Sequence, residues 1–342
     1  MLAPIASSRD HPHVQIFLAL SSALIAAAFL SAIMMLIGAI AFHFLVWRKT
    51  ALPLGPVREA ADREIFDIVA RWGLWSSAAL LVLAGPRLVG VASLLDDRYP
   101  LRTRLAALVL HSEWGIGFAA MLCAGLCAFV GFLIVRKHDR AGWGLAVASV
   151  PLIAVGSGLQ GHPFDAFATM TAAPIFDGIH SIGVGAWLGT FVYLVLAERR
   201  VQPHTSSPWT DPLGALIERY FRVSGALATL VILTGFFSAT MHLTTFDDLE
   251  GTQYGQLLAG KVAIVVILLA FNEFHRRHAE RQARTSERSR LVHTLRFQAG
   301  LIVLILALTA ILLDVAPPSV NEVRGEVFRT APRGAADTDA NR

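Results

Sequence analysis

The chain has 342 residues, of which 55% are hydrophobic and only 16% are charged, and its mean hydropathy is +0.57. A soluble domain carries roughly a quarter charged residues, so this composition excludes a soluble globular protein and predicts an integral membrane protein. The net charge of +4 and the pI near 9.4 do not indicate a nucleic-acid partner, because the basic residues follow a membrane topology.

Eight stretches of the sequence are long and apolar enough to cross a hydrocarbon layer, which needs about 20 such residues. The first apolar run is about twice the length of a cleaved signal, so we expect it to be retained. The sequence therefore predicts an all-α, polytopic membrane protein of about eight transmembrane helices in one unit. The predicted spans are 16–46, 65–92, 105–135, 142–160, 174–197, 220–242, 257–275 and 295–315.

Basic residues alternate between the two sides of this predicted topology. Eighteen Lys and Arg residues lie in or next to the loops after the first, third, fifth and seventh spans, against three in the alternate loops. Because loops rich in Lys and Arg stay in the cytoplasm, both termini are predicted to lie outside a plasma (inner) membrane.

A short internal similarity suggests two parallel four-helix repeats. Ser112-Glu113-Trp114-Gly115 precedes the third span and Thr252-Gln253-Tyr254-Gly255 precedes the seventh, each after a pair of aspartates. Parallel repeats occur in transporters, although a chance match is the alternative. On this hypothesis the halves are 1–160 and 161–316, followed by a polar, disordered tail at 317–342.

The candidate metal ligands gather on the predicted outer side. His180 lies about 9 Å inside the fifth span at 1.5 Å per residue, and Asp177 shares its helix face and could orient the ring. His162 lies in the preceding outer loop, and Met241 and His242 end the sixth span. Imidazole and thioether ligands suit copper, above all Cu(I). The alternative is a set of interfacial histidines with ordinary hydrogen bonds.

Other polar residues within the spans are weaker candidates. His111 and Glu113 point in opposite directions on a helix, and of the two we favour His111 as a ligand. Cys123 and Cys127 share a helix face and could bind Cu(I), or they are small buried side chains. Arg87 and Lys261 fall near the outer ends of their spans and could extend to the membrane surface, or one of them could neutralise Asp177.

From His162 to Pro318 the chain resembles the CopD/PcoD copper-resistance membrane proteins. The resemblance depends on a Gly-His pair in an outer loop, an Asp and a His ahead of Trp-Leu-Gly, an Arg- and aromatic-rich entry to the sixth span, a Thr-Gly pair, and a Thr-x-Tyr-Gly-x-x-Leu-x-x-Lys string. These motifs are Gly161-His162, Asp177 and His180 before Trp187-Leu188-Gly189, Arg219-Tyr220-Phe221-Arg222, Thr234-Gly235, and Thr252 to Lys261, with Pro317-Pro318 closing the last helix. Gln298 departs from the family, in which a Glu is expected early in the last helix.

The resemblance implies movement or handling of copper across the inner membrane, with a periplasmic copper carrier as a partner. Two alternatives stay open: a haem-b-binding electron carrier that uses His111 and His180 as axial ligands, and a copper-delivery assembly factor without transport. The chain has no Walker-type phosphate loop, and we do not expect an enzyme.

Overall fold

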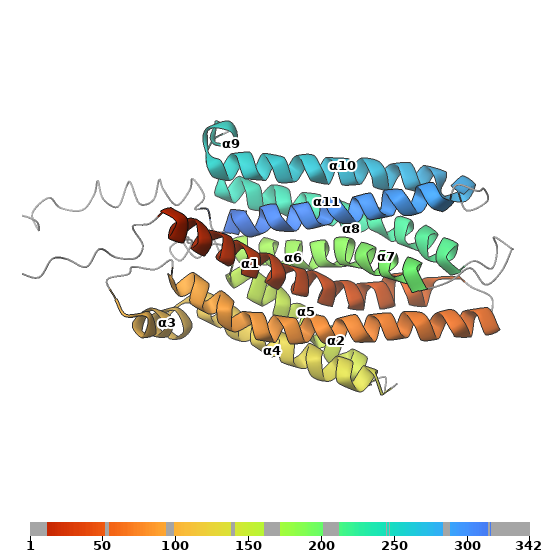
Figure 1. The fold of residues 1–342 in the computed structure, drawn as a ribbon, viewed down its shortest axis with the longest axis horizontal. Coiled ribbons are helices and arrows are strands. Elements are labelled where there is room, and N and C mark those ends of the chain that lie inside the picture. The colour runs from red at the N-terminus through yellow and green to blue at the C-terminus, as the bar shows by residue number, and fades with distance from the viewer. Residues whose placement is uncertain are drawn as a thin grey trace, which may run out of the picture.

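The computed structural model describes residues 12–51, 55–93, 99–137, 141–160, 172–200, 212–243, 245, 247–282, 288–313 and 315. Within these residues it is all-helical and has no strand. The long helices run side by side in one elongated bundle (Figure 1). In chain order the segments are α1 (Pro12–Ala41), the π-helical η2 (Phe42–Val46), the 3-10 segment η3 (Trp47–Lys49), α2 (Pro56–Ser93), α3 (Leu101–Leu110), α4 (Glu113–Val135), α5 (Ala141–Leu159), α6 (Ala173–Val184), the π-helical η4 (Gly185–Gly189), α7 (Thr190–Arg200), α8 (Pro212–His242), α9 (Asp248–Gly251), α10 (Gln253–Gln282) and α11 (Arg288–Leu313).

Among the described residues, eight helical stretches are long and apolar enough to span a membrane, and each matches one of the predicted spans. This confirms the all-α, polytopic fold class. The stretches are Leu20–Lys49, Arg58–Ser93, Glu113–Val135, Ala141–Leu159, Ala173–Arg200, Pro212–Met241, Gln253–His275 and His293–Leu313.

The third predicted span, 105–135, is not one continuous helix. Ser112 has an extended backbone, and its side chain accepts a hydrogen bond from the N–H of Gly115 at 3.2 Å. This N-cap separates the short helix α3 from the membrane-spanning α4. His111 consequently lies in a turn between two helices.

The two sequence-similar segments have the same local structure. Thr252 caps α10 as Ser112 caps α4, with the N–H of Gly255 donating to the Thr252 hydroxyl at 3.0 Å. A Cβ on Gly115 would lie 2.2 Å from a backbone carbonyl oxygen, and one on Gly255 would lie 2.1 Å from another. Each cap therefore needs a glycine three residues after the hydroxyl, because the preceding short helix (α3 or α9) is packed directly against it.

Two glycines let α1 and η4 cross with their backbones in contact. A Cβ on Gly38 would lie 2.6 Å from the Cα of Gly189, and a Cβ on Gly189 would lie 2.2 Å from the carbonyl oxygen of Met34. Small residues allow such close approach of membrane helices, where dispersion rather than the hydrophobic effect drives packing. Around this crossing, α5 packs on α6 and α11 packs on α1. The fourth spanning helix of each half thus lies on the first spanning helix of the other.

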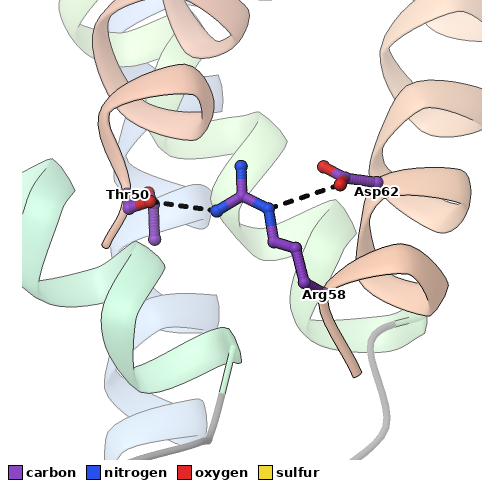
Figure 2. Close-up of polar contacts among 3 residues, drawn as sticks. All are labelled: Thr50, Arg58 and Asp62. Carbon is purple, nitrogen blue, oxygen red and sulfur yellow. Dashed lines mark hydrogen bonds and ion pairs between the residues drawn. The ribbon is translucent and has the colours of Figure 1, made fainter. Parts of the chain in front are cut away.

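Arginine side chains tie the end of α1 to two other helices. Arg58 of α2 donates from Nη1 to the carbonyl oxygen of Thr50 at 3.0 Å and from Nε to Asp62 at 3.3 Å (Figure 2). Arg219 of α8 donates to the carbonyl oxygen of Leu45 at 3.0 Å. These cations satisfy carbonyl groups that the end of a helix leaves without an intrahelical partner. We call this end of the bundle the basic end, and the opposite end, which holds α3 and α9 (Figure 1), the α9 end.

Candidate metal site

Three helices of the second half carry polar side chains at one depth below the α9 end. His180 lies seven residues after the start of α6, Thr234 eight residues before the end of α8, and Lys261 eight residues after the start of α10. At 1.5 Å per residue, each is about 10–12 Å from the end of its helix. The packing of α6 and α10 on α8 brings this level together.

The imidazole of His180 is fixed by a hydrogen bond to α8. Its Nδ1 lies 3.1 Å from Thr234 Oγ1, and that hydroxyl in turn lies 2.7 Å from the carbonyl oxygen of Leu230. The hydroxyl also lies 3.3 Å from the carbonyl oxygen of Val231, and it has one hydrogen to donate. When that hydrogen goes to a backbone carbonyl, Nδ1 carries a proton and donates to Thr234. The tautomer that results leaves the lone pair of Nε2 available to a ligand.

Gly235 provides the surface against which the ring lies. A Cβ at this position would be 3.0 Å from Cε1 of His180 and 3.4 Å from Nδ1. Any larger residue would push the ring away from Thr234. The adjacent Thr234 and Gly235 thus act on one side chain, the first through a hydrogen bond and the second by leaving space.

Two opposite charges lie next to the histidine. The carboxylate of Asp177 interacts electrostatically with the ammonium of Lys261, and Lys261 also acts on the ring of His180. All three side chains are partly buried. Neutralisation of Asp177 by Lys261 stays a prediction. A carboxylate and an ammonium at the same depth would keep the local net charge near zero, which lowers the cost of holding such groups within a membrane.

The remaining outer candidates lie nearer the α9 end or outside the described residues. Met241 is partly buried on α8, six residues beyond Gly235 and so about 9 Å further along the axis. The backbone of His242 is described as the last residue of α8, but its side chain and the whole of His162 lie outside the described part of the structure. Their convergence with His180 stays a prediction.

His111 is separated from this cluster. Its side chain is exposed in the turn after α3, and α3 and α4 pack on α2 and α5 rather than on α8. Cys123 is also exposed on α4, and Cys127 is partly exposed. The structure therefore places Cys123 on the surface of the bundle and not in an interior route.

Among the residues that the structure describes, no three His, Cys, Asp or Glu side chains are grouped closely enough to hold a metal ion. His180 and Asp177 lie three residues apart on α6, and the hydrogen-bond partner of the imidazole is Thr234 of α8, so the predicted role of Asp177 in orienting the ring stays a prediction. His43, by contrast, is stacked on Trp143, with ring centroids 3.8 Å apart and planes 9° from parallel, so it packs and is not part of the cluster.

Thr234 and Gly235 were noted in the sequence only as a motif, without a role. A hydroxyl and a glycine side by side in the middle of an apolar helix were the available signal, because such a pair often marks a close contact with a neighbouring helix. Nothing in the sequence indicated that His180 would be the side chain they contact.

Comparison with known families gives one result. Residues 214–312 match the family model for copper resistance protein D, CopD. No curated protein and no solved structure matched the chain. The matched residues include Thr234, Gly235 and Lys261, and His180 contacts this region from α6. Residues 214–312, which lie in helices α8 to α11, are therefore a CopD domain, the domain of copper resistance protein D.

Proposed function

We propose that this protein carries copper across the plasma membrane and that His180 is the essential ligand that binds the copper ion during transport. The single observation that supports this most is the fixed imidazole of His180, held by Thr234 and Gly235 of the CopD region with Nε2 available. A metal-ligating histidine almost always donates its other ring N–H to a neighbouring acceptor, as His180 does.

The α9 end is proposed to face outside, with both termini on that side. The support is the concentration of Lys and Arg at the basic end, which is typical of the cytoplasmic side. Copper delivered by a periplasmic carrier would then meet the α9 end first.

Copper is proposed to enter in two steps. His162, Met241 and His242 capture the ion near the surface, and His180 receives it about 9 Å deeper. Side chains tilt toward the N-terminus of their own helix. Because α6 and α8 run in opposite directions, Met241 and His180 lean toward one another across this gap. Thioether and imidazole together suit Cu(I), and an ion held by few ligands can also leave.

Asp177 and Lys261 are proposed to set the charge at the deeper position. A bare cation beside the ammonium of Lys261 would be repelled, and the carboxylate of Asp177 offsets this repulsion. The protein would thereby hold the ion weakly enough to pass it on.

The test is copper uptake by vesicles that contain the purified protein. Wild-type protein should bind and take up copper, His180→Ala should abolish uptake, and His293→Ala at the basic end should leave it unchanged. Met241→Leu combined with His162→Ala should weaken copper binding while the protein still folds. Binding without uptake would instead favour a copper-delivery assembly factor.

A visible spectrum separates copper from haem. Protein expressed with adequate haem should show no stoichiometric Soret band, because a haem needs two facing axial ligands and His111 is exposed on a different part of the bundle. A stoichiometric band that disappears in both His111→Ala and His180→Ala would reassign the protein as a haem-binding electron carrier.

A further inference from the structure

A small cavity lies in the interior of the second half, below the His180 level. It is lined by residues of η4, α7, α8, α10 and α11, and it offers about 10 Å3 to the centre of a water molecule. That space fits roughly one water. Its polar lining residues are Tyr220, Asn272 and Gln298.

Gln298 has a buried polar atom without a partner at this cavity. The residue is 3% exposed, and its Oε1 accepts no hydrogen bond. A buried carbonyl oxygen left unsatisfied costs about 1–3 kcal/mol. A water in the cavity would remove this cost by donating to Oε1, provided that other groups hold it in place.

Two neighbouring side chains can hold such a water. Trp187 hydrogen-bonds through its side chain to Tyr220, and because an indole N–H can only donate, the phenol hydrogen of Tyr220 is available to a second acceptor. Asn272 donates from Nδ2 to Ser224 Oγ at 2.9 Å, which leaves its second N–H for the cavity. The site therefore offers one acceptor and two donors, within the usual two to four partners of a buried water.

The cavity also lies on the path from His180 toward the basic end. Trp187 is seven residues, or about 10 Å, beyond His180 on the same spanning segment. Between the two levels, α8, α10 and α11 bury apolar side chains such as Val231, Ile264 and Ile305. The cavity thus holds the next polar groups that an ion would meet inside this half.

We propose that this cavity binds a water molecule and is a second polar site, deeper than His180, through which the transported copper ion passes; we call it the inner station. The second part rests on the proposed function, whereas the bound water does not. A cation leaving His180 must replace lost ligands with other dipoles, and the water with the oxygens of Gln298 and Tyr220 supplies them. The route then runs inside the second half, away from the exposed Cys123.

The experiment compares Gln298→Leu and Tyr220→Phe with Thr309→Val, a control on α11 whose hydroxyl bonds only within its own helix. A high-resolution experimental structure of the wild type should show water at Gln298 Oε1, and Gln298→Leu should lose it. In vesicles, Gln298→Leu should slow copper uptake by roughly tenfold or more, the effect of losing one buried hydrogen-bonding group. Equilibrium copper binding at the outer ligands should stay at the wild-type level in all three variants.

Three results would contradict the proposal in different ways. A dry cavity in the wild type would exclude the water site. Wild-type uptake by a correctly folded Gln298→Leu protein would exclude the inner station. Failure of the wild type to bind copper at all would overturn the proposed function and the station together, while the structure would still decide on the water.

Discussion

At the scale of single residues, the hydroxyl of Thr234 decides which nitrogen of His180 faces a ligand. When its own hydrogen is donated to the carbonyl oxygen of Leu230 at 2.7 Å, it can only accept from the ring. The arrangement makes Thr234 a positioning residue: it would not touch the ion and acts through His180.

Thr234→Val tests this role, because valine keeps the shape and removes the acceptor. The ring would lose its fixed tautomer, and copper affinity should fall by about 10- to 100-fold, the usual effect of removing a group that orients a metal ligand. The control is Thr229→Val, on an exposed face of the same helix with its hydroxyl bonded to Gly225. Equal affinities in competition titrations of the two variants would show that Thr234 does not orient the ring.

Gly235→Ala tests the space beside the ring. The new Cβ would lie 3.0 Å from Cε1 of His180, so the ring must move and its bond to Thr234 must weaken. Copper affinity should drop, and Gly235→Val should lower it further. Gly225→Ala on the same helix meets no atom within 4 Å and should bind copper as the wild type does. If Gly235→Ala also binds normally, the site tolerates a displaced ring.

At the scale of helices, the second half is joined to the first through the crossing of α1 and η4. This contact is backbone to backbone at Gly38 and Gly189, so no side-chain rotation can accommodate a new methyl group there. The π-helical turn η4, which contains Gly189 of this crossing, also carries Trp187, and Trp187 lines the interior cavity. Separation of the two helices would therefore disturb the cavity as well as the fold.

Gly189→Ala should destabilise the protein severely, because its Cβ would lie 2.2 Å from the carbonyl oxygen of Met34. We expect loss of the monodisperse peak in size-exclusion chromatography, or a large decrease in the melting temperature. Gly144→Ala, on α5 with no atom within 4 Å of the added Cβ, is the matched control. A Gly189→Ala protein as stable as this control would show that the helices can separate at little cost.

The end of α1 depends on Arg58. Its guanidinium donates to Thr50 and Asp62 (Figure 2). It also lies over the ring of Trp47, 4.4 Å from the centroid. Arg58→Met keeps the aliphatic stem but removes these contacts, and should lower the free energy of unfolding by about 1–3 kcal/mol. Arg63→Met, at an exposed position of the same helix, should change it little. Equal denaturant midpoints for the two variants would contradict this role.

At the scale of the whole molecule, we propose that the two halves are a parallel repeat. Three features fit one pseudo-two-fold axis along the bundle. The caps at Ser112 and Thr252 are equivalent, and Gly38 and Gly189 contact one another. The last spanning helix of each half, α5 or α11, packs on the first spanning helix of the other half. The polar cluster and the interior cavity belong to the second half alone.

A parallel repeat and the distribution of basic residues require the same orientation for both halves. Reporter fusions at positions 55, 138, 205 and 285 should therefore all report from the cytoplasm, and a fusion at 99 should report from the outside. A fusion at 285 that reports from outside would overturn this topology.

Much of this architecture could be predicted from the sequence. Hydropathy located all eight spans, because a segment in lipid must be apolar along its whole length and must satisfy its backbone internally. The candidate His180 and its neighbour Asp177 were also evident, since polar residues are rare and costly within a span. The break at Ser112 was missed because residues 105–110, the last part of α3, are all apolar and continue the apolar run of α4, and because a cap is visible only as a pattern of hydrogen bonds.

The sequence by itself determined the number of spans, the distribution of charge and the residue types available to a metal. Only the tertiary structure decided which of them meet. His180 and Thr234 are 54 residues apart, and Asp177 and Lys261 are further apart still. Such contacts depend on how α6, α8 and α10 pack, and that packing depends on backbone approaches such as Gly38 to Gly189. Hydropathy carries no information about these approaches, because every face of a membrane helix is apolar, whether it contacts lipid or protein.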